Sequence, residues 1–159
     1  MNTTKVIGKI FGSRQRAIEK YATETEAIQN RVFQKLIQQA APTEWGKKYD
    51  YAHIRTYEDF RRVPIQTYEE AKGYIDRMRH GEEDVLWPGK IIWYAKSSGT
   101  TNDKSKFIPV SKEGLYQCHY RGGTDCVVSY LNMNPDSRMF SGKGLILGGS
   151  HQISSLRKD

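Results

Sequence analysis

The chain has 159 residues, 37% of them hydrophobic, and a formal net charge of +7. This composition suits one domain or part of a larger one, and it excludes a chain that is disordered throughout. No apolar run approaches the ~20 residues of a membrane-spanning helix, and the N-terminus lacks the apolar block of a secretory signal, so we expect a cytoplasmic protein without a membrane partner.

Residues 1–41 are expected to form a helical lead-in. Apolar residues recur at helical spacing between Ile28 and Ala40, and Pro42 ends that pattern. Thr23 and Glu26 have the spacing of a capping box, in which the threonine side chain caps the first turn of the helix. The sequence therefore predicts that a helix begins directly after Thr23.

Residues 42–90 form a second helical segment in this interpretation. Thr56 with Asp59, and Thr67 with Glu70, repeat the spacing of the capping box. The second box precedes apolar residues at i, i+3, i+4 and i+7, namely Ala71, Tyr74, Ile75 and Met78. A helix is therefore predicted over residues 67–80.

The hydrophobic period changes in residues 91–110, where two short β-rich runs flank a polar stretch. The runs are Ile91 to Ala95 and Phe107 to Val110. The residues between them, Lys96 to Lys106, are small, charged or hydroxyl-bearing. We expect an antiparallel strand–loop–strand hairpin with an exposed turn.

Residues 111–159 complete the chain with a helix and a strand. Ser111 can cap the helix, and the apolar run Leu145–Leu147 is read as a buried strand. Cys118 and Cys126 would lie ~12 Å apart on one helix, too far for a disulfide, and their spacing favours no metal site. Both are expected to be small buried hydrophobic residues.

The polar loop carries the chemistry of the sequence. It reads Ser97-Ser98-Gly99-Thr100-Thr101, and Lys104 and Lys106 follow. Glycine lets a backbone approach a ligand closely, hydroxyl and N–H groups donate to phosphate oxygens, and lysine adds a mobile positive charge. Neither the Walker pattern nor GxGxxG occurs here. The residues alone fit a phosphate-binding loop or a plain polar hairpin turn.

This loop resembles the phosphate-binding signature of the acyl-adenylate-forming superfamily. The longer segment GEEDVLWPGKIIWYAKSSGTTNDKSKFIPVS resembles the auxin-responsive promoter family of acyl-acid amido synthetases. The segments TEWGKKYDY, YEDFRRVPIQTYEE and YIDRMRHGEEDVLWPG resemble the same family's approach to the loop. The resemblance extends from about Ala41 to Ser150.

The resemblance implies an α/β fold and a two-step, ATP-dependent ligase that uses magnesium. A carboxylic acid would react with ATP to give an acyl-adenylate, and an amino acid would then form the amide. Ser97, Ser98, Gly99, Thr100 and Thr101 would hold the phosphates. Lys106 occupies the family's position for the catalytic lysine, and Lys104 competes for that role. Asn102 departs from the glycine of the broader superfamily.

The resemblance further implies that the helix after Ser111 borders the acyl pocket, where Arg121 could pair with a substrate carboxylate or be a solvated helix arginine. Family members are much longer, so residues 1–159 are interpreted as an N-terminal piece of the adenylate-forming domain that lacks the C-terminal portion. The alternative from the positive charge is a non-enzymatic basic module that binds nucleic acid or another anionic partner. No dense Lys/Arg tract favours this alternative.

Overall fold

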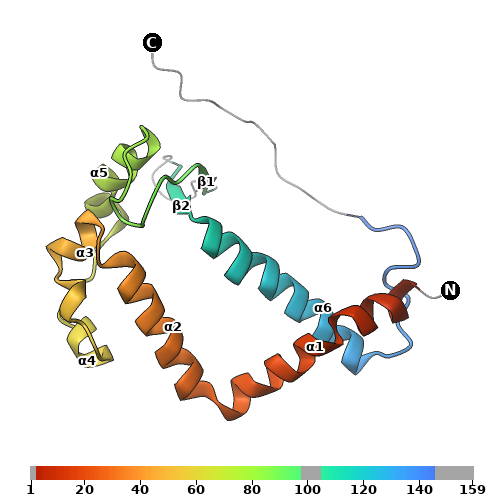
Figure 1. Ribbon diagram of the computed structural model, residues 1–159. Helices are drawn as coiled ribbons and strands as arrows, with labels where there is room; N and C mark the ends of the chain where they lie inside the picture. Colours follow the sequence, from red (N-terminus) through yellow and green to blue (C-terminus); the bar gives the residue numbers. More distant parts are fainter. Residues whose placement is uncertain (1–2, 98–104, 146–159) are drawn as a thin grey trace. The chain divides into compact units, whose positions relative to one another are not determined.

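The computed structural model describes residues 3–97 and 105–145 and is mainly helical, with one small sheet (Figure 1). The chain divides into two compact units. The first unit combines Met1–Thr23 with His119–Asp159, and the second is Glu24–Cys118. In the described part of the chain, no helix has the length and apolar character needed to cross a membrane.

The first unit is built around two helices, α1 (Thr3–Thr23) and α6 (Arg121–Met133). The second unit contains most of the remaining elements, namely α2 (Thr25–Ala40), α3 (Glu44–Lys48), the 3-10 helix η1 (Tyr51–His53), α4 (Tyr57–Phe60), α5 (Tyr68–Arg79), β1 (Trp93–Lys96) and β2 (Phe107–Val110). The π-helix η2 (Gly114–Tyr120) contains the boundary between the units, and Ser111 precedes it as predicted, its Oγ accepting the Gly114 N–H at 2.9 Å.

In the first unit, an ion pair joins α1 to α6. The guanidinium of Arg14 donates to both carboxylate oxygens of Asp125, at 2.8 and 2.7 Å, and both side chains are mostly shielded from solvent. The hydrogen bond to Asp125, and secondarily the one that Arg14 donates to the Tyr21 hydroxyl, raises the pKa of Arg14. Val128 of α6 is buried. A two-pronged pair of this kind fixes the register of two helices more strictly than apolar contact does.

In the second unit, a buried threonine organises the junction between α2 and α3. Thr43 is completely buried, and its hydroxyl donates to the Ala40 carbonyl at 2.7 Å and accepts the Gly46 N–H at 3.0 Å. The next two backbone N–H groups, of Glu44 and Trp45, donate to carbonyls of Asp84 and Val85. The junction thereby ties two segments that are about 40 residues apart in sequence.

Two apolar clusters pack around this junction. Ile37, Ala40, Tyr51 and Ile54 form the first, and Met78, Val85 and Ile91 form the second. Trp87 packs against both clusters. The second cluster buries the inner face of α5 and therefore fixes that helix against the rest of the unit.

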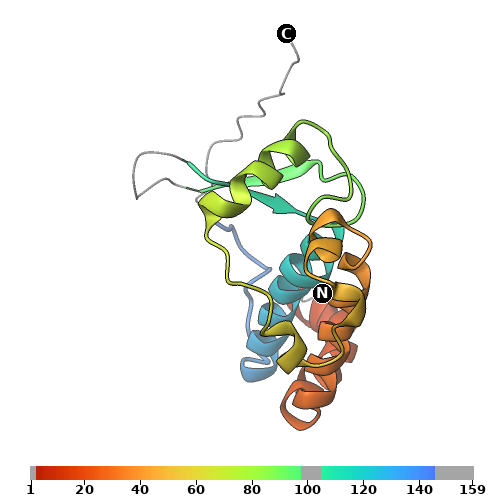
Figure 2. The same ribbon diagram turned by 90° about the vertical axis from the view of Figure 1, so that its left-hand side faces the viewer.

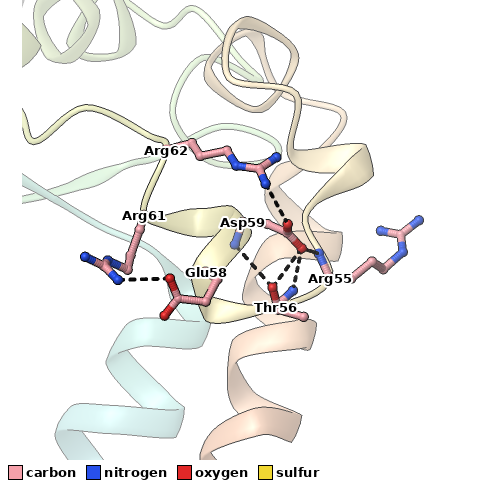
Figure 3. A network of polar contacts seen from close by, with 6 residues as sticks. All are labelled: Arg55, Thr56, Glu58, Asp59, Arg61 and Arg62. Carbon is pink, nitrogen blue, oxygen red and sulfur yellow. Dashed lines mark hydrogen bonds and ion pairs between the residues drawn. The ribbon is translucent and has the colours of Figure 1, made fainter.

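Both predicted capping boxes of the second unit are confirmed. At α4, the Asp59 carboxylate accepts the Arg55 and Thr56 N–H groups, and Thr56 Oγ1 accepts the Asp59 N–H (Figure 3). At α5, Thr67 and Glu70 repeat this exchange. The hydrogen bonds from the backbone, followed by those from the threonine hydroxyls, lower the pKa of both carboxyl groups.

Several sequence expectations are corrected. Thr23 does not cap α2, because it remains the last helical residue of α1, and Glu24 is the N-cap without a side-chain cap hydrogen bond. β1 begins two residues later than predicted, since Ile91 is buried in the second cluster. Cys118 and Cys126 are exposed and free, which overturns their expected burial. The predicted strand at Leu145–Leu147 falls outside the described residues beyond Leu145.

The close packing of the junction between α2 and α3 leaves no space for a side chain at Gly46. A Cβ at Gly46 would lie 2.1 Å from the Ala40 carbonyl oxygen, whereas one at Gly73 in α5 would meet nothing within 4 Å. We expect Gly46→Ala to destabilise the second unit by at least about 3 kcal/mol. Gly73→Ala should stabilise it by about 0.5–1 kcal/mol. Urea unfolding measures both, and an unchanged midpoint for Gly46→Ala would contradict this account of the junction.

The Arg14–Asp125 pair should control local opening of the first unit. Asp125→Ala leaves a largely shielded guanidinium without its carboxylate partner, so we expect the opening free energy of α1 and α6 to fall by about 1–3 kcal/mol. Amide hydrogen exchange of the two helices measures this. The control is Asp136→Ala, which removes an exposed aspartate. Equal amide exchange rates in Asp125→Ala and Asp136→Ala would show that the ion pair contributes nothing to the stability of the two helices.

The capping box of α5 should respond to acid. Because the pKa of Glu70 is lowered in the folded chain, its contribution to stability is complete above the ordinary value of 4.5 and is lost as the pH falls through the lowered value. Carbon-13 NMR titration of the Glu70 carboxyl should therefore give a midpoint below 4.5. Thr67→Ala should return the midpoint towards 4.5, and a wild-type midpoint at or above this value would refute the box in solution.

Candidate functional site

The hairpin formed by β1 and β2 frames the predicted loop. The strands pair antiparallel with Trp93 opposite Val110 and Lys96 opposite Phe107, which confirms the predicted hairpin. One step further, the Ser97 N–H donates to the Lys106 carbonyl at 2.9 Å, and the Lys106 N–H donates to Ser97 Oγ at 3.0 Å. Ser97 and Lys106 therefore close the base of the loop.

The two faces of the hairpin differ. Because side chains alternate along a strand, Tyr94 and Phe107 share one face, and Trp93, Ala95 and Ile108 share the other. Tyr94 packs against the second apolar cluster. On the opposite face, Trp93 is 44% and Ile108 52% exposed. The hairpin is thus supported from one side by the described residues.

Helix α5 supplies that support and crosses the two strands (Figure 2). Its buried residues, Ile75 and Met78, point into the core. A separate row of polar residues at four- and three-residue intervals lies on one side of the helix, namely Tyr68, Lys72, Asp76 and Arg79. These residues line the space beside the hairpin.

Three contacts attach Lys106 and the start of β2 to α5. The Tyr68 hydroxyl accepts the Phe107 N–H at 2.9 Å, and the Lys106 ammonium lies 5.3 Å from the centroid of the Tyr68 ring. The Arg79 guanidinium lies 3.7 Å from the centroid of the Phe107 ring and is held by Asp76 at 3.2 Å. The first residues after the loop are therefore fixed by both backbone and side-chain contacts.

A pocket of about 340 Å³ opens between α5 and the start of β2. Its lining comprises the four residues of the α5 row with Glu69, Ser105, Lys106 and Phe107. It offers three cationic side chains, those of Lys72, Arg79 and Lys106, against two carboxylates. Since Asp76 already pairs with Arg79, the two lysines face a single remaining carboxylate, which gives the pocket a preference for anions.

The predicted site residues are only partly brought together. Ser97 and Lys106 meet at the base of the hairpin, whereas Ser98, Gly99, Thr100, Thr101 and Lys104 lie outside the described residues. Arg121 is an exposed residue at the start of α6 in the first unit and does not line the pocket. Over residues 3–97 and 105–145, no group of three or more His, Cys, Asp or Glu side chains could hold a metal ion.

Sequence reasoning missed Tyr68 and Arg79. The signal was present, because Tyr68, Lys72, Asp76 and Arg79 recur at helical spacing beside the apolar stripe of the predicted helix. What the sequence could not indicate is that this polar side meets β2 rather than solvent.

A second cation is held by aromatic rings away from the hairpin. The Lys48 ammonium lies 5.2–5.4 Å from the ring centroids of Trp45, Tyr49 and Tyr74, and it donates to the Tyr74 hydroxyl at 2.8 Å. The Tyr74 hydrogen bond raises the pKa of Lys48. Because Lys48 belongs to α3 and Tyr74 to α5, this cluster braces the two helices.

Comparison with curated proteins gives relatives that are much longer than this chain. Indole-3-acetic acid-amido synthetase GH3.15 of Arabidopsis thaliana is 31% identical over 101 residues, which cover 63% of this chain and 17% of the relative. Jasmonoyl--L-amino acid synthetase JAR4 of Nicotiana attenuata is 29% identical over 104 residues, which cover 62% of this chain and 18% of the relative. The chain thus spans less than a fifth of the length of these two relatives.

The structural and family comparisons agree with these relatives. A solved structure titled GH3.15 acyl acid amido synthetase superposes with a TM-score of 0.62 and 26% identity, over 79% of this chain and 21% of that one. The family model described as GH3 family N-terminal domain matches residues 14–156. This match covers most of the chain and confirms the resemblance read from its motifs, so the chain belongs to the GH3 family.

Proposed function

We propose that the chain provides the ATP phosphate-binding loop of an acyl-acid amido synthetase and forms, over residues 1–159, the N-terminal part of its adenylate-forming domain. The observation that carries the proposal is the antiparallel hairpin, closed by Ser97 and Lys106, which frames the segment whose sequence resembles the superfamily's phosphate-binding signature. The names of the relatives, which are amido synthetases, support the reaction class.

The proposed reaction has two steps. A carboxylate oxygen of the acid attacks the α-phosphorus of ATP, an acyl-adenylate forms, and pyrophosphate leaves. The amine nitrogen of an amino acid then attacks the activated carbonyl carbon, AMP leaves with the former carboxylate oxygen, and the nitrogen loses a proton. Negative charge shifts onto the leaving phosphates in the first step, so donors aimed there lower the barrier.

The described residues at the base of the loop suit this task. Lys106 is exposed and, within the described part of the chain, has no carboxylate at ion-pair distance. Its ammonium therefore remains available for a phosphate. Ser97 to Thr101 would supply hydroxyl and N–H donors, and Lys104 would be the secondary cation. We propose that magnesium enters as the ATP complex and neutralises part of the phosphate charge.

Two further assignments belong to the proposal. Arg121 is proposed to pair with a substrate carboxylate because it is an exposed guanidinium in the helical stretch that follows Ser111. A cytoplasmic location is proposed from the sequence, since ATP and amino acids are abundant there.

Replacement of Lys106 tests the proposal. Calorimetric titration of the chain with magnesium-ATP should show that Lys106→Ala weakens binding about tenfold or more, because a charged contact to phosphate is lost. Lys104→Ala should weaken it less. The matched control is Lys35→Ala, which removes another exposed lysine of the same unit and should leave binding unchanged.

Two outcomes would contradict this proposal. Full ATP affinity in both Lys106→Ala and Lys104→Ala would show that neither lysine meets the phosphates. Absence of ATP binding, together with salt-dependent binding of single-stranded or duplex nucleic acid that survives Lys106→Ala, would instead favour the basic-module alternative.

A further inference from the structure

We infer that Tyr68 is a positioning residue for Lys106, and that it holds this lysine ready for the phosphate groups of the nucleotide. The inference rests on the proposed function, because it assigns Tyr68 a role in the same site. It concerns a residue from α5, outside both the hairpin and its signature. The observations are a backbone anchor, a side-chain contact and a supporting clamp, all on the first residues that follow the loop.

The backbone anchor comes from the register of the hairpin. In an antiparallel pair, residues alternate between those that exchange hydrogen bonds with the partner strand and those whose backbone groups face outward. Ser97 and Lys106 are bonded to each other, so the adjacent pair, Lys96 and Phe107, faces outward. The outward N–H of Phe107 donates to the Tyr68 hydroxyl at 2.9 Å. Tyr68 therefore fixes the backbone directly after Lys106.

The side-chain contact places the lysine itself. The Lys106 ammonium lies 5.3 Å from the centroid of the Tyr68 ring, within the range of a cation–π interaction. A ring attracts an ammonium without neutralising it, whereas a carboxylate partner would compete with phosphate. The lysine is thus restricted in its rotamers, and less entropy remains to be lost when it meets an anion.

The clamp keeps this arrangement in place. Phe107 is stacked under the Arg79 guanidinium at 3.7 Å, and Asp76 holds Arg79 at 3.2 Å. Tyr68 is itself the first residue of α5 and lies inside the capping box, so its position is set by Thr67 and Glu70. Both ends of the contact between Tyr68 and the strand are consequently fixed.

A double-mutant cycle tests the inference, with magnesium-ATP affinity as the readout. Tyr68→Ala should weaken binding about three- to tenfold in the wild-type chain. The same substitution should change affinity less than about twofold in the Lys106→Ala background, since Tyr68 acts through that lysine. Tyr57→Ala is the matched control, because Tyr57 likewise begins a helix directly after a capping-box threonine, and it should leave affinity unchanged.

Tyr68→Phe separates the two contacts. It retains the ring and removes the hydroxyl that accepts the Phe107 N–H, so exchange of the Phe107 amide should accelerate while part of the ATP affinity persists. Without nucleotide, the proton resonances of the Lys106 ε-methylene should be shifted upfield by the ring in wild type and in Tyr68→Phe, but not in Tyr68→Ala.

The outcomes distinguish the inference from the proposed function. If Lys106→Ala weakens ATP binding and Tyr68→Ala weakens it equally in both backgrounds, Tyr68 acts structurally and the inference is wrong. If the upfield shift is absent in wild type, the ring does not hold the lysine and the inference is also wrong. If the shift is present but Lys106→Ala leaves ATP binding unchanged, the contact exists and the proposed function of Lys106 fails.

Discussion

The buried hydroxyl of Thr43 is the constraint on which the second unit depends. It satisfies the Ala40 carbonyl and the Gly46 N–H in an environment without water, where an unpaired polar group would be costly. The following N–H groups bind the segment at Asp84 and Val85, and Arg77 of α5 then pairs with both Glu44 and Glu82. The position of α5 therefore follows from a turn that is about 25 residues earlier in sequence.

The geometry of the candidate site depends on contacts with α5. The capping box fixes the start of this helix, and its first residue, Tyr68, receives the backbone of β2. Arg79, at its other end, covers Phe107. A two-stranded ribbon has little stability alone, so packing against the helix is what makes a defined hairpin possible. The base of the loop is thus held by contacts that are remote from the loop in sequence.

The parts of the fold that were predicted from sequence are those with local causes. The capping boxes at Thr56 and Thr67 need only a three-residue spacing, and β2 is marked by its β-rich composition. The same spacing gave a wrong prediction at Thr23, because α1 continues through this residue and Thr23 is therefore not an extended N-cap residue. The buried Thr43 and the contact between Tyr68 and Phe107 were not predicted, since both depend on partners that only the folded chain brings near. The fine path of the predicted phosphate loop stays a prediction.

The open face of the hairpin has a consequence for the protein in solution. Trp93 and Ile108 present apolar surface on a chain that carries a net charge of +7. At low ionic strength, like-charge repulsion keeps such molecules apart. Added salt screens that repulsion within about 10 Å at 0.1 M, and strongly hydrated anions such as sulfate also strengthen apolar association. Charge repulsion therefore opposes apolar association in this chain, and added salt shifts the balance towards self-association. This is the reverse of the usual gain in solubility from the first additions of salt.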